Sequence, residues 1–254
     1  NFHTEGKDYA EWNKTLWDSA VEESSLIQNL KWRAGYLKKY LSSFTVYHFH
    51  DTSVSSPMRG DCNINDNEYL RDNGSNLAAF LYSMMQNDET NFRLIEGVVS
   101  SIAPYFKCFK LRPDVNDKER IRLEWEEKET DMYLNGYSFS DGTLRFIALA
   151  TLLLQSKTPE VIVIDEPELG LHPAAINKFA ELVKRASNKS QIILSTQSTN
   201  LVNCFDVKDI IVVDRIESQS VFRHLSEEDL ATWMDEYDLS ISDLWEKNMI
   251  GGQL

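Results

Sequence analysis

One stretch of the chain combines a strongly apolar run with an abrupt change to charge: VIVIDEPELGLHP, residues 161–173. Its first four residues are β-branched and apolar, and the run ends at Asp165 and Glu166, followed by Pro167. A short apolar run of this composition predicts a strand buried on both faces, as in a parallel sheet covered by helices. Ligands bind at the carboxyl ends of the strands in such sheets, which is where the two carboxylates fall.

The first half of the chain has mainly helical periodicity. Apolar residues recur at helical spacing between Leu26 and Leu37, which predicts helical structure over residues 1–41. We also predict a strand at 44–49, a polar loop at 51–76, and helices at 75–85 and 89–102. An antiparallel strand pair is expected at 106–112 and 120–126, around a turn at 116–118, with Ile121, Leu123 and Trp125 on one face.

The second half alternates strands with helices. Ser140 is placed to cap an apolar helix that runs to about residue 155, and Pro173 begins a helix that ends at Ala186. Strands are expected at 161–164, 191–196, 209–214 and 220–225, and short helices near Leu201, at 225–237 and at 242–248. This alternation predicts an α/β fold with a mostly parallel sheet covered by helices.

Composition narrows the class of protein. The 254 residues contain no apolar run long enough to span a bilayer, and the polar start is unlike a secretory signal. Three isolated cysteines argue against a disulfide framework or a zinc site, so we expect a cytoplasmic protein. The net charge of −14 excludes a generally basic nucleic-acid coat protein, although it leaves a local basic patch open. Residues 217–246 hold nine acids against one base, Arg223.

Three segments carry candidate chemistry in a fixed order. Successive strand residues point to opposite faces, so the aims of Asp165 and Glu166 differ, which suits one on a Mg²⁺ ion and its neighbour on an attacking water. The Ser140–Gly142 turn opens a helix whose N-terminus attracts anions, and Gln197 beyond the next strand could contact a γ-phosphate. Each segment also has an ordinary structural explanation. The two acids could be solvated and cap the next helix, many helices begin with Ser-Asp-Gly, and a Gln after a strand is usually a polar loop residue.

A histidine pair offers a weaker signal. His48 and His50 lie close to Asp51 in sequence, which suggests a metal site, but no further ligand spacing supports it. The sequence therefore favours a structural interpretation of this stretch.

Residues 137–215 resemble the C-terminal half of an ABC-type ATPase head of the SMC/RecF group, and most of all the bacterial RecF-like AAA ATPases. FSDGTLR (139–145) is similar to the signature motif, VIVIDEPE to Walker B, LGLHP to the D-loop and STQS to the switch. The ending DLWEKNMIGGQ, and more loosely YHFHDTS, also resemble that group.

The resemblance implies ATP and Mg²⁺ as cofactors and assigns roles to residues. Asp165 would hold Mg²⁺, Glu166 would polarise the attacking water, and Gln197 would lie near the γ-phosphate. The signature residues would contact ATP on a second subunit and so support a homodimer; they are Ser140, Asp141, Gly142 and Thr143. His172 would lie in the loop that links the two sites.

The sequence departs from the family pattern in three places. Gln197 replaces the usual His and cannot carry a proton, and Asp141 stands where many ABC heads have Gly. The printed sequence contains no GxxxxGK[ST], and the Gly6-Lys7 pair lacks its context. We therefore expect a C-terminal portion of a longer protein that binds ATP poorly alone.

These expectations combine into a domain plan and two functions. A mostly helical middle lobe is predicted at 1–104, an ATPase core at 105–225 and an acidic helical tail at 226–254. The leading hypothesis is an ATP-hydrolysing dimeric head that drives a clamp or a separate effector protein in DNA maintenance or anti-phage defence. DNA enters by family analogy alone. The alternative is a nucleotide-gated interaction module with little turnover; a plain structural domain is the third reading, and no membrane partner is expected.

Overall fold

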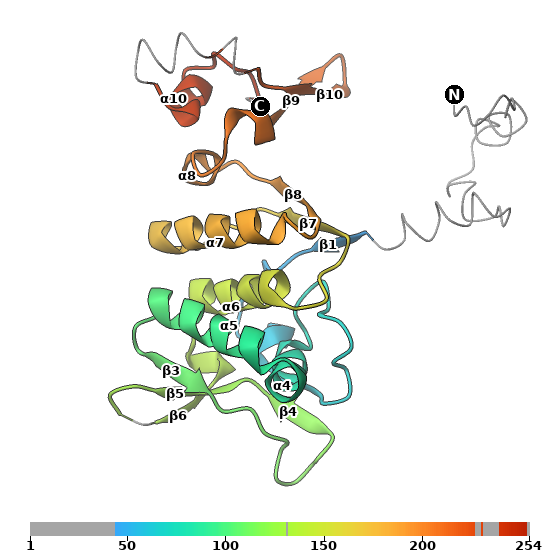
Figure 1. The fold of residues 1–254 in the computed structure, drawn as a ribbon, viewed down its shortest axis with the longest axis vertical. Helices are drawn as coiled ribbons and strands as arrows, with labels where there is room; N and C mark the ends of the chain where they lie inside the picture. The colour runs from blue at the N-terminus through green and yellow to red at the C-terminus, as the bar shows by residue number, and fades with distance from the viewer. Residues whose placement is uncertain (1–43, 131, 227–229, 231–238, 253–254) are drawn as a thin grey trace, which may run out of the picture.

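The structure is a computed structural model of the chain, and it describes residues 44–130, 132–226, 230 and 239–252. The helical structure expected over residues 1–41, and most of that expected at 225–237, lies outside these described residues. The fold is mixed α/β, as predicted, and its helices and strands are arranged in tiers along the long axis (Figure 1).

A three-stranded parallel sheet lies at the centre. Its order is β1 (Thr45–Tyr47), β7 (Val161–Asp165) and β8 (Gln191–Ser195), with β7 in the middle. The three predicted strands and their parallel arrangement are therefore confirmed. The first of them falls within the range expected to form the helical lobe, yet it pairs with the strand that carries Asp165.

The two faces of this sheet differ. Ile162 and Ile164 are buried in one core with helices α6 (Asp141–Leu154) and α7 (Pro173–Ala186). On the opposite face, the paired residues Val46, Val163 and Ile193 form a row in register. Val46 is 42% and Ile193 47% exposed. In the predicted strand itself Val161, Ile162 and Ile164 are buried and Val163 is half-buried, whereas the neighbouring strands leave this row partly exposed.

Helix α6 is the most buried helix of the described chain. Ser140 caps it as predicted by accepting a hydrogen bond from the Thr143 N–H, and every residue from Thr143 to Leu154 is buried. The predicted helices α4 (Leu77–Asn87) and α5 (Glu89–Ile102) are confirmed, and α5 packs on α6. Within the described ranges, no helix has both the length and the apolar character needed to cross a bilayer.

The predicted strand pair beyond α5 is only half right. β3 (Phe106–Phe109) pairs with β5 (Glu124–Glu127), which also pairs with β6 (Tyr133–Asn135). β4 (Arg120–Arg122) instead pairs with β2 (Asp61–Asn63) in a second sheet. The chain changes partner at Leu123, a break that alternation cannot reveal because the alternating residues on either side, Ile121 and Trp125, are buried as well. Two 3₁₀ turns, η1 (Pro57–Arg59) and η2 (Gly136–Ser138), border this region.

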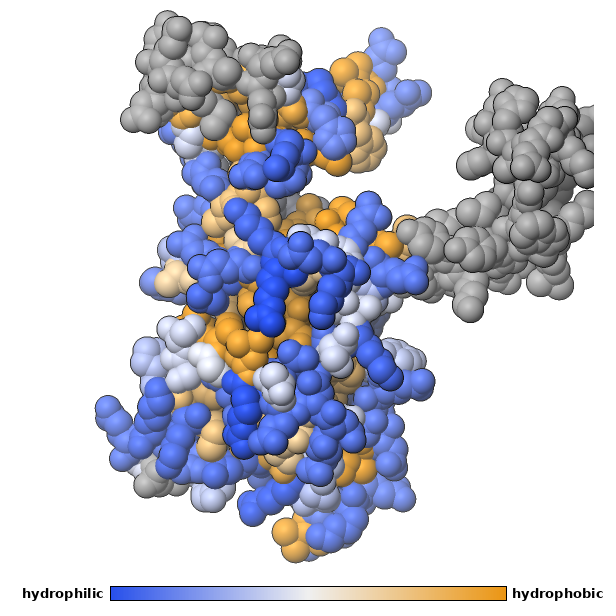
Figure 2. Space-filling view, viewed as in Figure 1, coloured by the Kyte–Doolittle hydropathy of each residue, from blue (hydrophilic) through white to orange (hydrophobic). Residues whose placement is uncertain are grey.

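The last described segments form a separate tier. After α8 (Thr199–Val202) and η3 (Val207–Asp209), β9 (Ile211–Ile216) and β10 (Gln219–His224) form an antiparallel hairpin. Its two turn residues have positive φ, which suits a tight hairpin turn, so local pairing prevails over the predicted α/β winding here. Apolar side chains of this hairpin reach the surface (Figure 2); the exposed ones are Ile211, Val213, Ile216, Val221 and Phe222.

The hairpin shares its core with the C-terminal helix. Val212 and Leu225 pack with Ile241 and Leu244 of α10 (Ile241–Glu246), in a cluster separate from the main core. This cluster extends across the predicted boundary at residue 226, and that boundary stays a prediction.

The first turn of α6 touches the loop that follows β7. A methyl group placed on Gly142 would lie 2.4 Å from the Gly170 carbonyl oxygen, closer than atoms can approach. Gly170 itself has a φ of +74°, a conformation that glycine adopts at little cost. Two glycines therefore bring the predicted signature motif and the predicted D-loop into backbone contact.

The two faces of the sheet predict different costs for the same truncation. Ile162→Ala should lower the free energy of unfolding by about 2–5 kcal/mol, because it leaves a cavity in the main core. Ile193→Ala in the neighbouring strand should cost less than about 1 kcal/mol, because its side chain is already half exposed. Urea denaturation of both variants measures this contrast, and equal losses would mean that the Ile193 face is covered in the folded protein.

The glycine contact yields a second matched pair. Gly142→Ala should destabilise the fold by about 1–3 kcal/mol, because the backbone of Gly170 leaves no room for a methyl group. Gly97→Ala in α5 meets no atom within 4 Å and should instead stabilise by about 0.5–1 kcal/mol. Thermal unfolding of the two variants would contradict the close approach if Gly142→Ala were neutral.

Candidate functional site

Three strands end at one edge of the parallel sheet. β7 ends at Asp165, β8 ends at Ser195 in register with it, and β1 leads into His48 and His50. Carboxyl ends of parallel strands meet at the same edge, which is where such sheets bind ligands. The structure thus places the predicted metal ligand where the sequence expects a site.

The two predicted acids at this edge are held differently. The Ser195 hydroxyl donates a hydrogen bond to Asp165 Oδ1, which fixes the direction of that carboxylate. Glu166 has a φ of +38°, and its N–H donates to the Ser195 carbonyl oxygen at 2.9 Å. A non-glycine residue at positive φ costs roughly 1–3 kcal/mol, and such strain concentrates at functional sites. The backbone therefore turns sharply at the residue predicted to polarise water.

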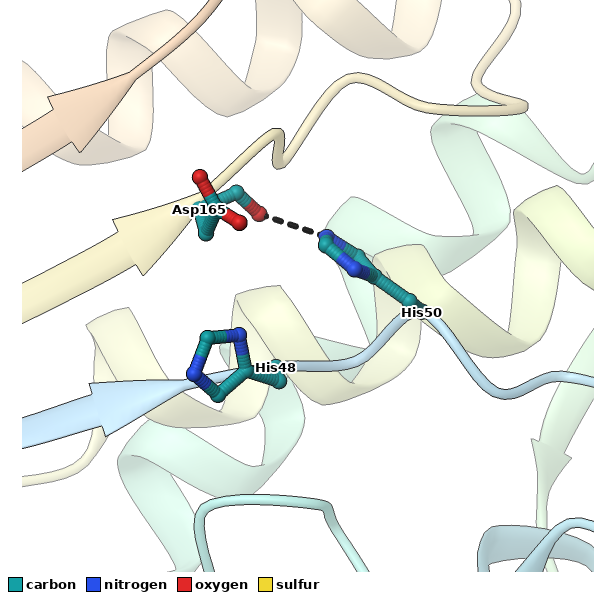
Figure 3. Close-up of side chains that lie close together, drawn as sticks. All are labelled: His48, His50 and Asp165. Atoms are coloured by element: carbon teal, nitrogen blue, oxygen red, sulfur yellow. Dashed lines mark hydrogen bonds between the residues drawn. The ribbon is translucent and has the colours of Figure 1, made fainter.

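Two histidines from the segment after β1 approach Asp165 (Figure 3). One potential ligand atom from each of His48, His50 and Asp165 lies within 4.8 Å of the others. His50 Nε2 is 2.8 Å from the Asp165 carbonyl oxygen. A carbonyl oxygen can only accept, so His50 Nε2 carries the proton in this contact. Asp51, the acid nearest in sequence, instead accepts hydrogen bonds from Ser53.

The signature turn is exposed at its tip and anchored below. Ser140 and Asp141 are exposed, whereas Thr143 is buried and lies 3.1 Å from the Tyr105 hydroxyl. The buried Arg59 pairs with the Asp141 carboxylate at 2.7 Å and donates to the carbonyl oxygens of Gly136 and Phe139. Asp141, which departs from the usual glycine, therefore has a defined structural partner.

A second buried arginine joins the signature helix to the strand edge. Arg145 is 4% exposed, and its Nε and Nη2 donate to the carbonyl oxygens of Phe49 and His50 at 2.9 and 2.8 Å. A methyl group on Gly170 would lie 3.2 Å from Arg145 Nη1. Burial lowers the pKa of the Arg145 guanidinium, and Asp141 and Glu168 partly offset this. The arginine stays charged in either case.

The loops after β7 and β8 also meet. Thr196 Oγ1 donates to Glu168 Oε1 at 2.5 Å, and the other oxygen, Oε2, is buried without a hydrogen-bond partner among the described residues. Gln197 is exposed in the loop between β8 and α8. His172 is exposed and caps α7, where its Nδ1 accepts a hydrogen bond from the Ala174 N–H.

The structure gathers part of the predicted set at this edge. Asp165 and Glu166 lie together, and Gly142 touches the loop that follows them. Ser140 and Gln197 are exposed, and the functional roles of all these residues stay predictions. Sequence reasoning missed Arg145, and it placed His48 and His50 beside Asp51 rather than beside Asp165. A charged residue inside an otherwise apolar helix was the available signal for Arg145, because a buried charge requires partners.

Known proteins of several kinds are similar to parts of this chain. Sequence relatives include the ABC transporter A family member 11 of Dictyostelium discoideum (30% identical over 111 residues, 39% of this chain and 13% of the relative). The Old nuclease of Escherichia phage P2 is 31% identical over 111 residues, which cover 39% of this chain and 19% of the nuclease. The energy-coupling factor transporter ATP-binding protein EcfA2 of Staphylococcus aureus is 26% identical over 136 residues, which cover 50% and 46% of the two chains. The chain thus spans less than half the length of each of these relatives.

Solved structures and a family profile complete the comparison. A structure from work on ATP-driven dimerization and DNA stimulated activation of SMC ATPases matches with a TM-score of 0.45 and 20% identity, over 63% of this chain and 98% of that one. An Smc head domain from Pyrococcus furiosus bound to the C-terminal domain of ScpA gives 0.46 and 20%, over 63% and 40%. The profile of the family described as "AAA domain, putative AbiEii toxin, Type IV TA system" matches residues 31–203. The chain belongs to this AAA family.

Proposed function

We propose that this chain supplies the Walker B, signature, D-loop and switch segments of an ATP-hydrolysing head that dimerises around nucleotide. One observation carries the proposal: Asp165 and Glu166 lie at the carboxyl edge of a parallel sheet, and the signature helix touches the loop that follows them through Gly142 and Gly170. Family membership makes ATP the expected nucleotide.

The donor chemistry at this edge fits Mg²⁺. Asp165 presents a half-buried carboxylate whose direction is set by Ser195, and oxygen ligands are those that Mg²⁺ prefers. The ion would neutralise charge on the nucleotide phosphates. Glu166 is the residue that would accept a hydrogen bond from the attacking water, with its position fixed by the strained turn.

The exposed end of α6 supports a role across a dimer interface. Ser140 and Asp141 are exposed at the N-terminus of a 14-residue helix, where N–H groups and the helix dipole favour an anion. In our proposal Ser140 and Gly142 form the surface that meets the γ-phosphate of ATP held by a second copy, and the buried Thr143 holds Ser140 through the hydrogen bond between their hydroxyl groups. His172, just beyond the D-loop, would face the same interface.

The uncovered face of the sheet is consistent with a shared nucleotide site. Val46, Val163 and Ile193 form an apolar row on the side of the sheet that carries Asp165 and Ser195. The printed sequence contains no GxxxxGK[ST] segment. We propose that the phosphate-gripping part of the site packs on this row.

The last part of the proposal is what the ATPase head acts on. Similarity to a protein named a nuclease supports a clamp or effector that works with DNA, in genome maintenance or anti-phage defence. The alternative is a nucleotide-gated interaction module. Gln197 favours that alternative, because an amide can donate a hydrogen bond but cannot carry the proton or charge of the usual His.

Replacing Glu166 distinguishes an ATP-hydrolysing head from a nucleotide-gated interaction module. In the complete protein, Glu166→Gln should lower ATP turnover by roughly 10²–10³-fold and trap ATP-bound dimers, because the water loses its acceptor while the nucleotide contacts remain. Steady-state phosphate release and light scattering with ATP measure the two effects.

A matched change serves as control. Glu181→Gln lies on the exposed surface of α7, where its carboxylate pairs with Lys178, and it should leave turnover unchanged. Negligible turnover in both the parent protein and Glu166→Gln, together with ATP-dependent dimers in each, would support the interaction module instead. Full turnover in Glu166→Gln would overturn the assignment of that residue.

A further inference from the structure

We propose that His48, His50 and Asp165 form a binding site for a first-row transition-metal dication such as Mn²⁺, Co²⁺ or Zn²⁺. One ligand atom of each residue lies within 4.8 Å of the others, at the edge where β1 and β7 end (Figure 3). Two imidazoles and one carboxylate are a recurrent ligand set for such metals and leave coordination positions open for water or substrate. The site needs no nucleotide, so it extends beyond the proposed ATPase chemistry, although it shares Asp165 with it.

The geometry is close to what a metal requires. Zinc binds imidazole nitrogen and carboxylate oxygen at about 2.0–2.2 Å, so ligand atoms around one ion lie about 3–4 Å apart. Closing a spacing of 4.8 Å to that range requires the ligand atoms to approach by about 1–2 Å. His48 is exposed, and its side chain can make that adjustment by rotation, whereas its N–H is held by the Asp72 carbonyl oxygen at 2.9 Å.

The outer contacts prepare two of the three ligands. His50 Nε2 donates a hydrogen bond to the Asp165 carbonyl oxygen at 2.8 Å, which fixes the direction of the ring, and in the proposed site Nδ1 would bind the metal. Ser195 orients the Asp165 carboxylate through Oδ1. Metal-binding histidines and carboxylates commonly make such second hydrogen bonds, and their loss typically lowers metal affinity by about 10–100-fold.

Arg145 donates hydrogen bonds to the backbone of the segment that carries His50. Its guanidinium donates to the carbonyl oxygens of Phe49 and His50, and it is rooted in the helix that begins with the signature turn. Arg145 is therefore a positioning residue for His50. The hydrogen bond from Arg145 to the His50 carbonyl oxygen therefore connects the backbone at a proposed metal ligand directly to the signature helix.

The ligand set predicts metal selectivity. Mg²⁺ prefers oxygen ligands, whereas imidazole favours later first-row ions such as Co²⁺, Ni²⁺ and Zn²⁺. His48 and His50 should thus strengthen binding of these ions and leave Mg²⁺ binding, which rests on the Asp165 carboxylate, little changed.

The test is a Co²⁺ titration of the nucleotide-free full chain, followed by visible d–d absorption. We expect one Co²⁺ per chain, with affinity at least about 10-fold weaker in His48→Ala and in His50→Ala. His224→Ala, an exposed histidine on β10, is the matched control and should bind Co²⁺ as the parent does. Circular dichroism reports folding, and the exposed His48 keeps the test valid if His50→Ala unfolds.

Several outcomes would overturn the site. These are unchanged Co²⁺ affinity in a His48→Ala, His50→Ala double variant, loss of binding in His224→Ala instead, or no Co²⁺ binding by the parent chain. The result is separable from the fate of the ATPase proposal. Histidine-dependent Co²⁺ binding without ATP turnover would sustain this site alone, and Glu166-dependent turnover without Co²⁺ binding would sustain the ATPase alone.

Discussion

The rest of the site depends on the hydrogen bonds that the buried guanidinium of Arg145 makes to the backbone. It is rooted in α6, it satisfies two carbonyl groups in the segment after β1, and it lies against the glycine loop after β7. Burying a charge is costly unless hydrogen bonds compensate for it, so this arrangement persists because Phe49 and His50 supply the acceptors. Three segments that are distant in sequence are thereby fixed at one edge of one sheet. The site geometry follows from that constraint.

Arg59 performs a similar task on the other side of the signature turn. It pairs with Asp141 and donates to backbone carbonyls, while Phe139 stacks on Trp125 with ring centroids 4.6 Å apart. The turn that we propose to meet a second subunit's nucleotide is therefore held by a buried cation and an aromatic stack. A rigid turn suits that proposal, because contacts that are already in place cost little conformational entropy on binding.

The sequence predicted the central elements well, because their signals are local. The apolar run before Asp165 and the cap at Ser140 each depend on a few neighbouring residues, and both are confirmed. Partner choice is not local: of the predicted strand at 120–126, β5 pairs with β3 as expected but β4 pairs with β2, and β9 pairs with β10 rather than with the parallel sheet. The approach of His50 to Asp165 likewise depends on β1 and β7 being neighbours, which no single stretch encodes. The uncovered row at Ile193 was missed because an apolar strand looks the same whether one face or two are covered.

The most direct measurement is the effect of Arg145→Lys on stability and on amide hydrogen exchange near His50. An ammonium cannot span the two carbonyl groups that the guanidinium serves, and each buried acceptor left without a partner costs about 1–3 kcal/mol. We predict a loss of unfolding free energy of that size, with faster exchange in the segments after β1 and β7. Arg93→Lys, at an arginine on α5 whose side chain is 62% exposed and whose charge the lysine keeps, should change stability by less than about 0.5 kcal/mol. Parent-like stability and unchanged exchange in Arg145→Lys would contradict the account.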